Sequence, residues 1–137
     1  MYGTVNAVCT FKGEHGSGAS VHFSQGPKDK GTRIYGGAGG SMTINSLGDL
    51  REGCDGTGMV WNPFIGTIGY GYSRNPVPSP GALGHLQADK NGVDVWANVD
   101  LSGTHSIIGR SLNNGYDCCV IGLTAGSTYV AKPVYQP

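Results

Sequence analysis

The residues best suited to metal binding or redox chemistry are four histidines and four cysteines, and their spacing decides what they could do. The histidines are His15, His22, His85 and His105, and no two of them have the spacing of metal ligands. A glycine cluster at residues 36–40 superficially resembles a phosphate-binding loop, but neither a Lys-Ser/Thr pair nor a helix follows it. The sequence therefore disfavours both a histidine metal site and a nucleotide site.

Charge and composition narrow the classes of partner. Nine Lys and Arg balance nine Asp and Glu, with neither a basic stripe for nucleic acid nor a polybasic cluster for anionic membranes. Only 13% of the residues are charged, which suggests that a partner covers part of the surface. The sequence shows no apolar run near the ~20 residues of a membrane span and no signal-peptide pattern at its start. We therefore expect a cytoplasmic protein that binds neither nucleic acid nor membrane.

Short β-rich runs separated by glycine-rich turns must position these residues, and helix periodicity is poor throughout. The clearest runs cover residues 83–88 and 93–99, which Asn91-Gly92 is predicted to join as a type I′ hairpin. The prolines of residues 53–81 exclude a central strand and predict a long loop. Regularly spaced short strands with such turns indicate an antiparallel sandwich or barrel.

Several segments, taken in order, resemble the copper,zinc superoxide dismutase family. They include Ala7-Val8-Cys9, Leu47-Gly48-Asp49 and residues 88–93, 105–110 and 119–122, so the resemblance covers residues 7 to 122. It implies an all-β fold, an eight-stranded antiparallel Greek-key β-barrel with shortened functional loops. Residues 1–123 would form this domain and residues 124–137 a C-terminal tail. The short loops resemble those of the metal-ligand-depleted superoxide dismutase-like proteins of poxviruses, which suggests that subgroup.

The resemblance also implies that the metal ligands have been replaced. Two copper ligands of the family match Thr43 and Asn45, the bridging histidine matches Val60, and the zinc aspartate matches Ala82. The last copper histidine and two further zinc histidines find no counterpart in this chain. Because Thr, Asn and Val cannot replace imidazole in a copper redox site, we expect no metal and no cofactor. The resulting hypothesis is a pseudoenzyme, a member of an enzyme family that is not itself an enzyme.

The family's intramolecular disulfide corresponds to Cys54 and Cys118, so the resemblance predicts that bond. Cys119 could compete for Cys54, but successive residues of a strand face opposite sides, so only one of the pair can point at the loop. Cys9 matches a buried cysteine of the family and is expected to be inert core. Four reduced core thiols are the alternative, since disulfides are unusual in the cytosol.

The positions that match the family's dimer contact are retained. They are Gly48, Asp49, Leu50, Arg51, Ile108, Gly109, Val120, Ile121 and Gly122. We therefore expect a homodimer, or a heterodimer with a dismutase copper chaperone, and a decoy or modulator acting through this face. The alternative is that these residues only pack the barrel.

Two other functions stay open at this point. One is a structural protein, such as a virion component, located in the virion or the host cytoplasm if the source is viral. The other is a residual copper,zinc superoxide dismutase in which His85, His105 or Cys119 holds copper in a new way.

Overall fold

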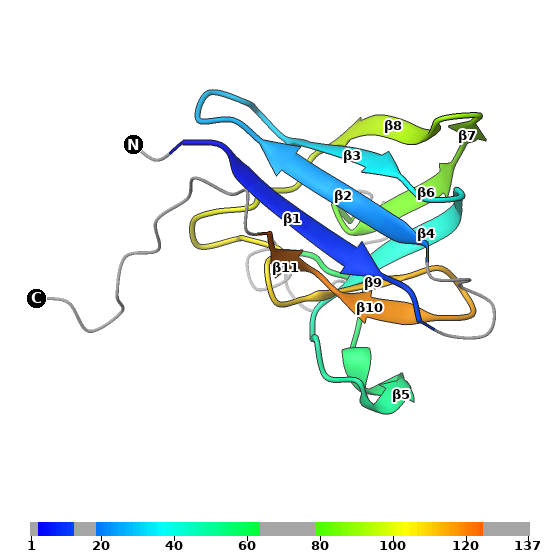
Figure 1. Ribbon diagram of the computed structural model, residues 1–137. Helices are drawn as coiled ribbons and strands as arrows, with labels where there is room; N and C mark the ends of the chain where they lie inside the picture. The colour runs from blue at the N-terminus through cyan, green and yellow to red at the C-terminus, as the bar shows by residue number, and fades with distance from the viewer. Residues whose placement is uncertain (1–2, 13–18, 64–78, 125–137) are drawn as a thin grey trace, which may run out of the picture.

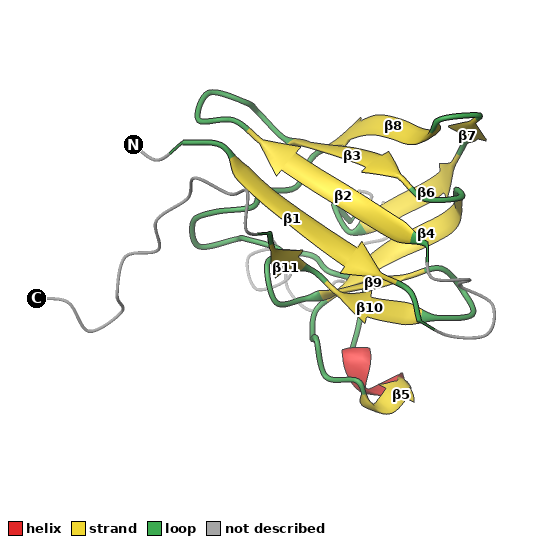
Figure 2. Cartoon of the chain, viewed as in Figure 1, coloured by secondary structure: helices red, strands yellow, loops and turns green. Residues whose placement is uncertain are grey.

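The computed structural model describes residues 3–12, 19–63 and 79–124 (Figure 1). Nearly all regular structure in these ranges is β-strand, with one 3-10 turn, η1 (Figure 2). The described residues contain no helix long and apolar enough to cross a membrane. The strands are β1 Val5–Thr10, β2 Ser20–Gln25, β3 Thr32–Gly36, β4 Gly40–Asn45, β5 Arg51–Cys54, β6 Ala82–Leu86, β7 Ala88–Asp89, β8 Gly92–Ala97, β9 Ser111–Asn113, β10 Cys118–Val120 and β11 Gly122–Leu123, and η1 is Asp55–Thr57.

The described strands form two antiparallel sheets that close into a barrel. One sheet has the order β11-β1-β2-β3-β8-β7 and the other the order β10-β9-β4-β6. Two chain segments belong to both sheets, because β6 leads into β7 across Gln87 and β10 leads into β11 across Ile121. If β6–β7 and β10–β11 are each counted as one strand, the barrel has eight strands; the other six are β1, β2, β3, β4, β8 and β9. The short strand β5 lies in a connection outside both sheets. The predicted eight-stranded Greek-key barrel is confirmed.

Alternating side chains explain why these strands pack as they do. Val5, Ala7 and Cys9 of β1 are buried and the residues between them are not, as expected for a strand with one face inward. Phe23 of β2 and Ile44 of β4 have no exposed surface, and they bring the two sheets together at the core. Full burial of each such side chain contributes about 1.5–3 kcal/mol.

The predicted hairpin between residues 83–88 and 93–99 is present, but its turn lies one residue earlier than expected. Asp89 pairs with Gly92, which leaves Lys90 and Asn91 as the two central residues. Gly92 has φ 95°, and a Cβ there would lie 3.0 Å from the Cα of Gly36. Close packing against β3 therefore requires glycine at the first position of β8.

Two predicted segments fall largely outside the described residues. The long loop of residues 53–81 is described only at its ends, where it contains the end of β5, η1 and the segment leading into β6. Of the tail at residues 124–137, only Thr124 is described, and its backbone N–H donates to the carbonyl oxygen of Asn6 over 2.9 Å.

Candidate functional site

The four positions matched to metal ligands lie together on the outer side of the four-stranded sheet. Thr43 and Asn45 alternate along β4 with Met42 and Ile44, whose side chains are buried in the barrel. Val60 pairs with Asn45 through an isolated antiparallel bridge, and Ala82 pairs with Thr43 in the β4–β6 ladder. The structure therefore gathers these positions as the resemblance implies, although they come from three separate segments.

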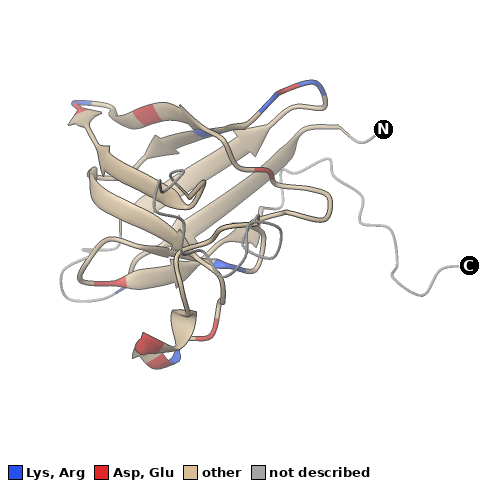
Figure 3. Cartoon of the chain, turned by 180° about the vertical axis from the view of Figure 1, so that it is seen from behind, with Lys and Arg blue, Asp and Glu red and all other residues tan. Residues whose placement is uncertain are grey.

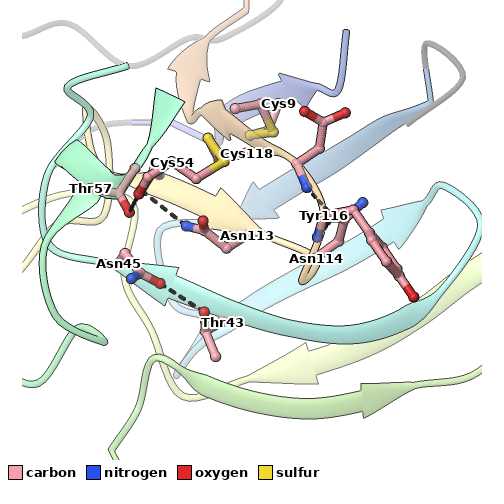
Figure 4. The surroundings of a disulfide bond; sticks show 12 residues. Cys9, Thr43, Asn45, Cys54, Thr57, Asn113, Asn114, Tyr116 and Cys118 are labelled. Atoms are coloured by element: carbon pink, nitrogen blue, oxygen red, sulfur yellow. Dashed lines mark hydrogen bonds between the residues drawn. A yellow bond between two sulfur atoms is a disulfide. The ribbon is translucent and has the colours of Figure 1, made fainter. Parts of the chain in front are cut away.

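The donors at this place are neutral and are bonded to the protein. The Thr43 hydroxyl donates to Oδ1 of Asn45 over 2.7 Å (Figure 4). Nδ2 of Asn45 donates to the Gly58 carbonyl over 2.8 Å. Val60 and Ala82 add only aliphatic carbon. Across residues 3–12, 19–63 and 79–124, no three or more His, Cys, Asp or Glu side chains gather as a metal site would require. The donor set of these residues therefore does not fit a copper or zinc ion, which takes imidazole, thiolate or carboxylate ligands.

Both pairs of cysteines are joined as disulfides. Cys54 at the end of β5 is bonded to Cys118 of β10, with the Cα atoms 5.7 Å apart (Figure 4). Cys119 is bonded to Cys9 of β1, with the Cα atoms 5.4 Å apart. Cys9 is therefore buried in the core as expected, but the expectation that it is inert there is wrong, because it forms a disulfide. The alternation of side chains along β10 explains the arrangement, because Cys118 faces the β5 segment while Cys119 points into the barrel.

The two disulfides act on different parts of the barrel. Cys9–Cys119 joins the six-stranded sheet to the four-stranded sheet, and both residues are at most 3% exposed. Cys54–Cys118 instead holds the β5–η1 segment against β10. The Thr57 hydroxyl reinforces that segment by donating to the Cys54 carbonyl over 2.6 Å, and the backbone N–H of Leu47 donates to the Thr57 carbonyl over 2.9 Å.

Arg110 holds the start of the loop that leads from β4 to β5. Its Nη1 donates to the Ser46 carbonyl over 2.8 Å and its Nε donates to the Ser106 carbonyl over 3.1 Å. The guanidinium carbon lies 3.5 Å from the ring centroid of Trp61, a cation–π contact. Partial burial lowers the pKa of Arg110 from its usual value. A planar cation held by two carbonyls and a ring restrains the direction of the loop after β4.

Part of the predicted partner face is assembled beside β10. A Cβ on Gly48 would lie 2.2 Å from the Gly109 carbonyl oxygen and 3.4 Å from Cγ1 of Val120, so these three residues are in close contact. Leu50 and Val120 are 37% and 39% exposed and line one groove of about 410 Å³. Ile121, in contrast, has no exposed surface and belongs to the core.

Charged residues border this place on more than one side, since Lys12 and Asp117 line the same groove as Leu50 and Val120. Arg51 donates from Nη2 to Asp49 over 2.7 Å, and hydrogen bonds from the Arg51 side chain and backbone lower the pKa of the Asp49 carboxyl. Figure 3 shows charged positions gathered on the β5 segment and at hairpin turns, with most of the strands between them uncharged.

Sequence reasoning missed several exposed apolar side chains next to these residues. Leu47 is 53% exposed, Met59 is 69% exposed and Leu123 is 45% exposed. Leu47 lies near Gly58, and Leu123 follows Val120 on the same bent segment. We call Leu47, Leu50, Met59, Val120 and Leu123 the β10 face. Leu123 pairs with the buried Ala7 and so has an inward place in the alternation, which does not predict its exposure. Leu47 and Met59 lie in loops without a period.

Two relatives found by comparison with known proteins carry the same name. No family model matches the chain. It is 33% identical over 119 residues to a protein of Saccharomyces cerevisiae named superoxide dismutase [Cu-Zn], covering 79% of this chain and 76% of the relative. It is 29% identical over 119 residues to the protein of the same name from Kluyveromyces lactis, with the same coverage.

These names correct one prediction. Both relatives are named as superoxide dismutases, which are enzymes, so the prediction that the chain is not an enzyme is wrong on this comparison. The replaced ligand positions concern only the metal ligands among the described residues. They do not measure activity.

Proposed function

This chain belongs to the copper,zinc superoxide dismutase family, and we propose that it acts by pairing with a second barrel of that family through its β10 face. The observation that carries the proposal is that two exposed apolar side chains, Leu50 and Val120, line one groove beside β10. Leu47, Met59 and Leu123 add exposed apolar side chains on the segments next to it. The partner is a second copy of this chain, a dismutase or a dismutase copper chaperone. Pairing with either of the last two would make the chain a modulator of metal delivery or of dismutase assembly.

The β10 face supplies apolar area that a partner can cover. Full burial of a Leu, Met or Val side chain is worth about 1.5–3 kcal/mol, so covering the exposed parts of several of them contributes a few kcal/mol. Exposed apolar patches on soluble proteins mark interaction sites. A surface of this kind can also pair with itself about a two-fold axis, which is the commonest symmetry of soluble oligomers.

The face is also held in shape before any partner binds. The Cys54–Cys118 disulfide ties the segment that carries Leu50 to β10, and the backbone of Gly48 packs so closely against Gly109 that no Cβ fits between them. A surface already ordered in the free protein loses less conformational entropy on association. This preorganisation supports a binding role for the segment in addition to a packing role.

Size-exclusion chromatography with light scattering tests the proposal. The protein is measured alone, then mixed with a dismutase and with a dismutase copper chaperone, and each measurement is repeated with Val120→Asp. Trp96→Asp is the control, because Trp96 is an equally apolar side chain, 60% exposed, on β8 in the other sheet. The proposal expects a dimer that Val120→Asp dissociates and Trp96→Asp leaves intact.

Other outcomes of this experiment would contradict the proposal or favour another function. A monomer in every mixture, or a dimer indifferent to Val120→Asp, overturns the proposal. Assemblies larger than a dimer would favour a structural role, such as that of a virion component.

Dismutation of superoxide is a second candidate, favoured by the names of both relatives. Its test is the decay rate of superoxide in the presence of the purified protein, together with its copper and zinc content. The described residues offer no fitting donor set, and residues 64–78 contain no His, Cys, Asp or Glu. Activity that rises with stoichiometric copper would therefore implicate Glu14 or His15, the residues of these four types that lie outside the described ranges. Activity that is absent from protein supplied with both metals would count against this candidate.

A further inference from the structure

One end of the barrel contains a cavity of about 550 Å³ that the pairing surface does not use. It lies where the β3–β4 and β9–β10 turns meet, and these turns occupy the same end of the barrel in Figure 1. The β10 face depends instead on the loop that follows the other end of β4. We propose that this cavity binds a small, uncharged aromatic molecule with one hydrogen-bonding group. The proposal is independent of the proposed pairing.

The floor of the cavity is apolar and belongs to the core. Phe11, Val21 and Met42 line it, and each is at most 4% exposed. The phenyl ring of Phe11 and the thioether of Met42 are groups that make favourable contacts with an aromatic ring. A ligand that reaches this floor therefore needs an apolar, planar part.

The cavity exists because the turn that crosses this end carries only small residues. The β3–β4 connection contributes Ala38 and Gly39, and Gly39 has φ 83°. A Cβ on Gly39 would lie 2.6 Å from the Leu86 carbonyl oxygen, so no side chain can be added there.

At the opposite end of the barrel, the connection between β8 and β9 fills the core with large apolar side chains. The β8–β9 connection leaves β8 at Ala97, which pairs with Thr32 at the far end of β3. That connection places Leu101 and Ile107 in the core, with 1% and 0% exposure. The backbone N–H of Leu101 donates to Oε1 of Gln25 over 2.8 Å, which holds this residue in place. Two large apolar residues thus fill one end of the barrel, whereas the β3–β4 turn at the other end offers only alanine and glycine.

The rim of the cavity is polar where the structure describes it. Ser41, His85, Asn114 and Tyr116 line it, and none of its described lining residues is Lys, Arg, Asp or Glu. Tyr116 is 76% exposed and projects from the β9–β10 turn (Figure 4). Oδ1 of Asn114 accepts the N–H groups of Tyr116 and Asp117 over 2.9 and 2.7 Å, which fixes this turn.

Together these features describe a ligand class. The volume falls in the range of small-molecule sites, roughly 300–1,000 Å³, and the mouth of a β-barrel is a common place for them. An apolar floor favours a ring, and the described rim, which has no Lys, Arg, Asp or Glu, offers no strong partner for an ion. The hydroxyl, amide and imidazole groups can pair with one polar substituent. Indole has this chemistry and serves as the probe.

The experiment is a titration of the full chain with indole, followed by amide chemical shifts in two-dimensional ¹H–¹⁵N NMR. We expect saturable binding with shifts at Gly39, Met42 and Tyr116 and none at Val120. Ala38→Leu places a larger side chain at the mouth and should weaken binding by about tenfold or more. Ala82→Leu, the same change at an exposed position of β6, is the control and should not.

The proposal is overturned if the wild-type protein shows no saturable shifts, if the shifts lie elsewhere, or if Ala38→Leu binds as tightly as Ala82→Leu. If Ala38→Leu does not fold, the position of the shifts in the wild-type protein decides the matter by itself. Indole-3-acetate, which adds a carboxylate to the same ring, should bind more weakly than indole. Tighter binding of the anion would contradict the uncharged ligand class.

Discussion

Replacing Cys9 and Cys119 together by alanine removes the covalent link between β1 and β10, and we expect a large loss of stability. The bond joins residues 110 apart in the sequence. The chain-entropy relation gives about 4.8 kcal/mol for a loop of that length at room temperature. The Cys54–Cys118 bond spans 64 residues, and the same relation gives about 4.3 kcal/mol. Since domains are stable by roughly 5–15 kcal/mol in total, either loss removes a large fraction of the free energy of unfolding.

The assay is guanidinium unfolding of the parent, the Cys9→Ala/Cys119→Ala variant and the Cys54→Ala/Cys118→Ala variant under oxidising conditions. Both variants should have much lower midpoints than the parent. Only the second should also lose dimerisation at concentrations where it remains folded, because only that bond anchors the β5 segment of the β10 face. An unchanged midpoint for the first variant would refute the reasoning, as would recovery of Cys9 in a peptide that carries a free thiol.

Two further predictions concern the turn that carries the face. Gly48→Ala should destabilise the protein by about 1–3 kcal/mol in urea unfolding, because its Cβ would lie 2.2 Å from the Gly109 carbonyl oxygen. Gly122→Ala meets nothing within 4 Å and is the matched control. Arg51→Gln should raise the pKa of Asp49 toward its ordinary value of about 3.9, measured by NMR titration of the carboxyl carbon, because hydrogen bonds from Arg51 now lower it. With the lowered pKa, the stabilisation from Asp49 is complete above the unfolded-state pKa and is lost as the pH falls through the folded-state pKa. A pKa unchanged in Arg51→Gln would contradict the pairing.

The fold was predictable because its signals are local and repeated. Alternation along β1 and β2 places Ala7 and Phe23 inward, and the structure has both buried. The hairpin at residues 83–99 followed from its turn chemistry, although the turn is centred on Lys90 and Asn91. That one-residue difference depends on the close approach of Gly92 to β3, a contact that no local pattern contains.

Of the two disulfides, the sequence predicted Cys54–Cys118 but not Cys9–Cys119. The rule that successive strand residues face opposite sides correctly separated Cys118 from Cys119. Applied once more, the rule places Cys119 inside the barrel, where alternation along β1 also places Cys9. The second bond was missed because it depends on which strands meet across the barrel, and a family resemblance that assigns Cys9 to the core says nothing of a partner for it.

The candidate site was predictable in position more than in chemistry. Thr43, Asn45, Val60 and Ala82 do gather at one place, since β4 pairs with β6 and with the bridge at Val60. The prediction, made from these substitutions, that the protein is not an enzyme is wrong, because the relatives are named as enzymes. Exposure on the partner face was also only partly predictable, as the buried Ile121 shows.

The most direct test of the account is the mass of the protein in solution, measured by light scattering for the parent and for Val120→Asp, alone and with a dismutase copper chaperone. Pairing through the β10 face predicts a two-barrel complex, either of two copies or with the chaperone, that Val120→Asp reduces to monomers. A protein that is monomeric in both settings, or a complex that survives the aspartate in the middle of the β10 face, would contradict it.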